Sequence, residues 1–136
     1  MSWDVYILRF PSELTGTDEL PEGWEPPSLG TGREVRAVLA RTLPGIVLGE
    51  DGWGDFDGPG VSLNLSVSGA GDEPVTSVAL HFYGGGPASA PTALAVAEAL
   101  TARALDLGSG DFLTPDTARS ALDAWRGYRD HVLGRP

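Results

Sequence analysis

The sequence predicts a single α+β domain spanning residues 1–136, with a mostly antiparallel sheet of about four strands and three helices packed on one face. Three observations lead to this expectation. Apolar and polar residues alternate from 61 to 68 and from 75 to 83, on either side of a turn at 69–74, which is typical of an antiparallel hairpin. Three other segments carry apolar residues at helical spacing. The length of 136 residues suits one domain.

The first strand is predicted at residues 3–10, where β-branched and aromatic residues dominate until Pro11 ends the run. Both faces of this strand are largely apolar, so we expect it in the centre of the sheet. Residues 11–31 are punctuated by proline and glycine and predict a long irregular segment. Within it, Trp24 is expected to dock on the core; an exposed aromatic anchor for a partner is the alternative.

The first helix is expected from about residue 33 to residue 43, with Thr31 as its cap. The Pro44-Gly45 pair ends it, and a short strand at 46–48 follows.

The second helix is predicted from about 91 to 104, and the third from about 115 to 133. Between them, residues 105–113 form a turn-rich connector with room for a very short strand. Thr114 precedes a proline and an acid, an arrangement typical of a helix start.

The composition is poor in catalytic groups. The chain has no cysteine and only two histidines. It has nine basic residues, all arginine, and nineteen acidic residues, which gives a net charge of −10. Most reactions at neutral pH need a nucleophile, a general base or a metal, so this composition favours a binding protein over an enzyme. The negative charge disfavours nucleic acid and anionic membranes, and it favours a basic protein partner.

The chain start lacks the basic and apolar regions of a signal peptide, and no apolar run approaches the roughly 20 residues of a membrane span. Together with the absence of cysteine, this predicts a cytoplasmic protein. The sequence leaves the oligomeric state open.

Residues 49–60 form the richest predicted loop, in which Asp51, Asp55 and Asp57 alternate with glycines and aromatic residues. A calcium site of the EF-hand type needs a different spacing and a distal glutamate, so no metal is predicted. A solvated glycine-rich loop is the simplest interpretation. The leading functional hypothesis is a protein-binding edge, where Trp53 and Phe56 supply apolar area and the aspartates meet arginine or lysine. The predicted partner-binding residues, on this loop and on the 69–74 turn, are Asp51, Trp53, Asp55, Asp57, Asp72 and Glu73.

His81 alternates onto the small polar face of the predicted hairpin, which also carries Ser62 and Ser66. A small hydrolase or ligand-binding site on this face is the alternative function. No Gly-x-Ser-x-Gly motif is present, and a hydrogen-bonded surface histidine is the simpler interpretation. The glycine run at 84–86 lacks the third glycine of a dinucleotide fingerprint, where Ser89 stands, so no cofactor is predicted.

Three segments resemble a group of short uncharacterised bacterial proteins: the opening MSWDVYI, the W-G-x-x-D-G-P loop at 53–59, and the connector at 105–112. These motifs consist of tryptophans and turn glycines, so the resemblance implies a structure and no particular reaction. In size and charge the chain is also loosely similar to the immunity proteins that neutralise bacterial toxins. That similarity implies an inhibitor that occludes a basic partner, with no catalytic residue carried over.

Overall fold

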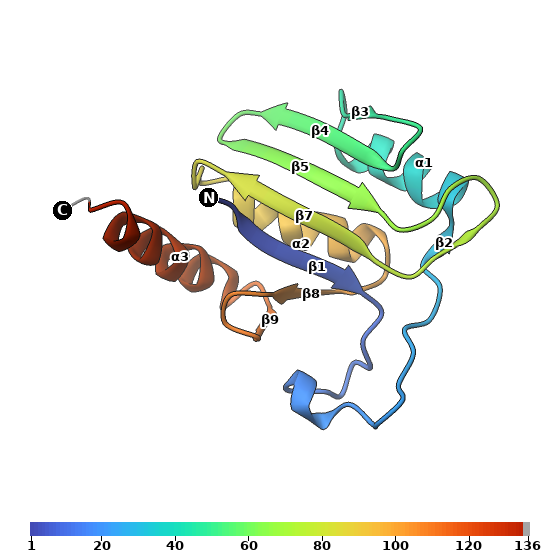
Figure 1. Ribbon diagram of the computed structural model, residues 1–136, viewed down its shortest axis with the longest axis horizontal. Helices are drawn as coiled ribbons and strands as arrows, with labels where there is room; N and C mark the ends of the chain where they lie inside the picture. The colour runs from blue at the N-terminus through green and yellow to red at the C-terminus, as the bar shows by residue number, and fades with distance from the viewer. Residues whose placement is uncertain (135–136) are drawn as a thin grey trace.

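The computed structural model describes residues 1–134 (Figure 1). Seven antiparallel strands form the main sheet in the order β3-β4-β5-β7-β1-β8-β9, and β2 pairs with β6 in a separate two-stranded sheet. The strands are β1 (Trp3–Leu8), β2 (Gly30–Thr31), β3 (Val47–Leu48), β4 (Trp53–Gly58), β5 (Val61–Val67), β6 (Pro74–Val75), β7 (Val78–Tyr83), β8 (Arg103–Asp106) and β9 (Phe112–Leu113). The helices are α1 (Gly32–Thr42), α2 (Ser89–Ala99), α3 (Ala118–Val132) and the short 3-10 helix η1 (Thr17–Glu19).

The α+β class and the three α-helices are as predicted, but the expected sheet of about four strands is wrong, because the main sheet has seven. Strand β4 was placed in a loop because its sequence, WGDFDG, is poor in β-branched residues. Pairing with β5 at six consecutive positions makes it a strand nonetheless. The predicted second helix also ran too far. α2 ends at Ala99, and Thr101 takes a left-handed φ of 52° that turns the chain into β8.

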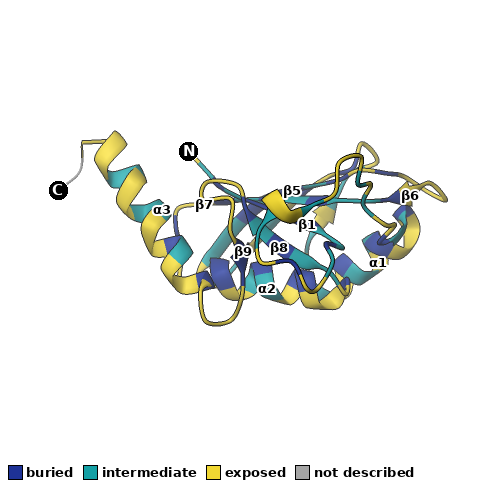
Figure 2. Ribbon diagram, turned by 90° about the horizontal axis from the view of Figure 1, so that it is seen from below, coloured by how far each residue is buried: buried dark blue, intermediate teal, exposed yellow. Residues whose placement is uncertain are grey.

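The sheet has helices on one face (Figure 2). α1 and α2 lie beneath that face, whereas α3 starts beside α2 and runs obliquely past the end of the sheet. Ala118 and Leu122, in the first half of α3, are buried in the main core, but Tyr128 and Val132 are exposed. The other face of the sheet carries none of the three α-helices. The segment after β1 packs against its β8–β9 end, and the side chains of the remaining strands meet solvent on this face.

The core lies between the sheet and the helices. In β1, Trp3, Val5 and Ile7 are almost fully buried, and their neighbours at even positions point to the opposite face. β1 lies between β7 and β8, which confirms its predicted central position. The predicted pairing of the hairpin is confirmed: β5 and β7 pair in register from Ser62 opposite Tyr83 to Val67 opposite Val78. Its returning strand starts at Val78 and not at residue 75 as expected, because Val75 belongs to β6 and pairs with β2.

Thr31 caps α1 as predicted. Its hydroxyl accepts from the backbone N–H of Glu34 (3.1 Å), and the Glu34 carboxylate accepts from the backbone N–H of Thr31 (3.1 Å). These reciprocal bonds satisfy two donors that a helix start leaves free. Hydrogen bonds from the backbone and the side chain of Thr31 lower the pKa of Glu34 below its ordinary value.

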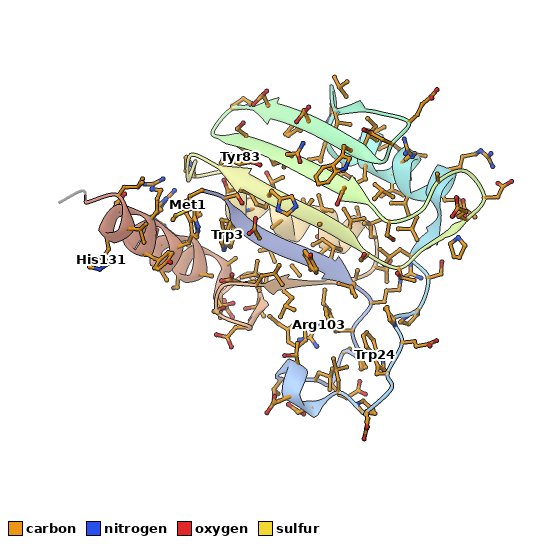
Figure 3. All side chains as sticks on the ribbon, viewed as in Figure 1. Met1, Trp3, Trp24, Tyr83, Arg103 and His131 are labelled. Carbon is orange, nitrogen blue, oxygen red and sulfur yellow. The ribbon has the colours of Figure 1, made fainter. Side chains whose placement is uncertain are left out.

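The long segment after β1 folds back on the edge of the sheet. Trp24 stacks on Phe10 with ring centroids 5.5 Å apart, which supports the docking interpretation. The guanidinium of Arg103 lies 3.8 Å from the ring centre of Phe112 and donates to the carbonyls of Pro11 and Leu14. Figure 3 shows Arg103 beneath β8, facing the segment that carries Trp24. This packing covers one end of the helix-free face and leaves β4, β5, β7 and β1 open.

Candidate functional site: the open face of the sheet

Four adjacent strands, β4, β5, β7 and β1, present an uncovered surface that we call the open face (Figure 1). Their side chains alternate between the core and this surface, so the sequence pattern determines what it exposes. The side chains on the open face are Trp53, Asp55 and Asp57 from β4, Ser62, Asn64 and Ser66 from β5, Ala79, His81 and Tyr83 from β7, and Asp4 and Tyr6 from β1.

A polar row crosses all four strands. Asp55, Asn64, His81 and Asp4 stand opposite one another in register. The Asn64 amide donates to Asp55 Oδ1 at 2.8 Å, and His81 Nδ1 lies 2.7 Å from Asp4 Oδ1. Ser2 donates to the same Asp4 oxygen at 2.5 Å. The row therefore consists of two hydrogen-bonded pairs, each fixed in orientation.

Trp53 lies over the neighbouring strand. Its ring stacks against the His81 imidazole with centroids 6.2 Å apart and planes inclined by 26°. The positions in register with Trp53 on β5 and β7 are Ser66 and Ala79, which are small. The ring therefore has room to extend across β5. The result is a flat aromatic surface in the middle of the open face.

The open face combines exposed aromatic rings with negative charge. Trp53 is 48% exposed, Tyr83 45% and Tyr6 38%. Figure 3 shows Tyr83 at the end of β7. Asp4, Asp55 and Asp57 supply carboxylates, and none of the four strands, all fully described, carries an arginine. Aromatic rings with complementary charge are typical of protein interfaces.

The structure divides the predicted partner-binding residues between two places. Trp53, Asp55 and Asp57 lie on the open face, where Ser62 donates to Asp57 at 2.6 Å. They belong to β4, so the prediction of a solvated glycine-rich loop at these positions is wrong. Phe56 packs against the core on the other face of β4, so it adds no apolar area to the open face.

The remaining predicted residues lie near the turns beyond the strand ends. Asp51 accepts from the backbone N–H of Trp53 (3.1 Å) and shares a hollow of about 160 Å³ with Glu73. Asp72 forms an exposed ion pair with Arg33, which offsets its charge. Asp72 is therefore a weaker candidate contact than the open-face aspartates.

Sequence reasoning missed Asp4, Tyr6 and Tyr83 as members of this site. The sequence of β1 could have indicated two of them, because alternate residues of a strand point to opposite faces. Asp4 and Tyr6 therefore share one face, and Trp3 and Val5 share the other. The prediction of two largely apolar faces concealed it.

The open face lacks the arrangement of a serine hydrolase. Asp4 is bound to the Nδ1 side of His81, as in a catalytic triad, but the Ser2 hydroxyl donates to Asp4 instead of lying against the free Nε2. Ser62 is engaged with Asp57. Among residues 1–134, no group of three or more histidine, aspartate and glutamate side chains is placed to hold a metal ion.

Comparison of the chain with protein-family models and with curated proteins gives no match. In the described part of the chain, no helix is both long enough and apolar enough to cross a membrane.

Proposed function

We propose that the open face binds a basic surface of another protein, and that the protein acts by occluding that surface. The observation that supports this most strongly is the open face itself: three exposed aromatic rings and three aspartates on four adjacent strands, with no arginine among them. Rigid strands hold these groups in place, so little side-chain freedom is lost on binding. An immunity-type inhibitor of a toxin would use such a surface in this way.

Affinity capture with matched baits tests this proposal. One bait is the native chain, and a second carries Trp53→Ala, Asp55→Asn and Asp57→Asn on the open face. The control carries Glu22→Gln and Glu25→Gln, exposed positions in the 11–29 segment, and has the same net charge as the open-face variant. We expect a basic protein from the source organism to bind the native chain and the control, and to bind the open-face variant at least about tenfold more weakly.

Two results would contradict the proposal. One is equal capture by all three baits, and the other is a partner whose binding does not weaken as the salt concentration rises. Failure to recover any partner at low salt would also count against it.

A second candidate is a hydrolase in which His81 acts as a general base. The Asp4–His81 pair favours it, because a carboxylate on Nδ1 leaves Nε2 free to accept a proton. Among residues 1–134, no hydroxyl forms a hydrogen bond with His81 Nε2, so water would have to attack the substrate. Loss of a measured hydrolysis in His81→Gln, with partner binding retained, would favour this candidate.

A further inference from the structure

A groove of about 560 Å³ lies between α3, the start of β1 and the turn after β8. On α3 it is lined by the aromatic rings of Trp125 and Tyr128 and by the small side chain of Ala124. Trp3 lines the facing side, and Figure 3 shows Trp3 and Met1 on the side of β1 nearest α3. Small-ligand sites enclose about 300–1,000 Å³, so this volume suits a small molecule.

Trp3, which lines the groove, carries a buried donor without an acceptor. Trp3 is 1% exposed, and its indole Nε1 has no hydrogen-bond partner among residues 1–134. The other tryptophan of the groove differs, because Trp125 Nε1 donates to the Ser2 carbonyl at 3.1 Å. A buried N–H without a partner is unfavourable, and most native structures satisfy such groups with protein, water or ligand. An acceptor on a molecule in the groove would satisfy Trp3.

The groove also contains a buried carboxylate without a cation. Asp106 is 4% exposed and accepts from the Gly108 N–H (2.9 Å) and the Ser109 hydroxyl (3.1 Å). No arginine or histidine among residues 1–134 forms an ion pair with it. Buried aspartates are rarely left without a positive partner. Asp4 also lines the groove, but its carboxylate is bound to His81 and Ser2 on the open face, so Asp106 supplies the negative charge.

An arginine that lies over one of these rings is already engaged. The Arg129 guanidinium lies 5.1 Å from the ring centre of Trp125, and its Nε donates to Asp130 at 3.1 Å. It shows that the Trp125 ring accepts a cation, but Arg129 is not among the residues that line the groove.

We propose that this groove binds a small organic cation that carries an apolar body and a hydrogen-bond acceptor. The positive group pairs with Asp106, the acceptor receives the Trp3 N–H, and the apolar body packs against Trp125 and Tyr128. This site is separate from the contacts made by Trp53, Asp55 and Asp57, so the inference does not rest on the proposed function.

The test uses three amines and the indole N–H signals of the ¹⁵N-labelled protein. L-Phenylalaninamide, added as its cation, has all three features: an ammonium group, an amide carbonyl as acceptor and a phenyl ring as apolar body. We expect it to move the indole signals of Trp3 and Trp125 and to leave those of Trp24 and Trp53 in place. N-acetyl-L-phenylalaninamide lacks the charge and should bind at least about tenfold more weakly. Phenethylamine lacks the acceptor and should move the Trp125 signal without the Trp3 signal. The Trp3→Phe variant assigns the signal of Trp3.

Variants on α3 then locate the site. Ala124→Leu narrows the groove at an exposed helical position, and Ser120→Leu makes a similar change on α3 away from it. We expect Ala124→Leu to weaken binding of L-phenylalaninamide about tenfold or more, and Ser120→Leu to leave it unchanged. Unmoved Trp3 and Trp125 signals, equal binding of the acetylated analogue, or native affinity in Ala124→Leu would each overturn the proposal.

Discussion

Trp53 reaches His81 across a whole intervening strand, a span of about 10 Å between the backbones of β4 and β7. It does so because Ser66 and Ala79 leave the space beneath the indole open. The Asp4 carboxylate holds the imidazole from the other side. Single small residues thus determine the shape of the open face, and large ones at the same positions would remove the flat aromatic surface.

At the residue scale, replacing two different glycines by alanine should change the stability in opposite directions. A Cβ at Gly127 would meet nothing within 4 Å, so Gly127→Ala should raise the free energy of unfolding by about 0.5–1 kcal/mol through a more restricted unfolded chain. A Cβ at Gly32 would lie 2.8 Å from the backbone of Ala70. Gly32→Ala should therefore lower the free energy of unfolding by about 1–3 kcal/mol. Urea denaturation of both variants measures the difference, and equal effects would contradict the packing at Gly32.

At the scale of elements, the sequence pattern predicted the strands and the helix start that are determined by neighbouring residues in the chain. The β5–β7 hairpin follows from strict alternation, and the start of α1 follows from the Thr31–Glu34 capping pair. β4 and β8 were missed because tertiary pairing overrides weak propensity. WGDFDG resembles a loop, and RALD resembles the continuation of a helix until the left-handed turn at Thr101 is seen.

The candidate site was predicted in part for the same reason. Trp53, Asp55 and Asp57 were identified by residue type, although their backbone was assigned wrongly. Asp4 joins them because β1 and β7 pair over 77 residues of sequence separation, which no local pattern indicates.

The cap of α1 predicts a pH dependence at the element scale. The pKa of Glu34 is lowered in the folded chain, so its ionised form stabilises the fold above the ordinary value of 4.5. This contribution is lost as the pH falls through the lowered folded-state pKa. The stability difference between the native chain and Glu34→Ala should be largest at neutral pH and shrink as the pH falls below 4.5. Urea midpoints across this range measure it, and a difference that grows on acidification would contradict the cap.

At the scale of the whole molecule, the net charge of −10 is expressed at the surface, because many of the arginines are engaged within the fold. Arginine side chains are largely used within the fold: Arg9 donates to Leu100, Arg36 to Gly49, Arg103 to Pro11 and Arg126 to Gly85, all at backbone carbonyls. The carboxylates of the open face stay at the surface. Such a molecule attracts a basic partner over a distance set by the salt concentration. The two-layer fold then presents a rigid sheet to it.

The most direct test of the account is to map the contact on the protein once a basic partner has been captured. Backbone amide and indole signals of the ¹⁵N-labelled chain are compared with and without that partner. The account predicts that the largest changes fall on β4, β5, β7 and the N-terminal half of β1, with the Trp53 indole among them. Changes confined to α1 and the 11–29 segment, with the Trp53 indole unaffected, would contradict it.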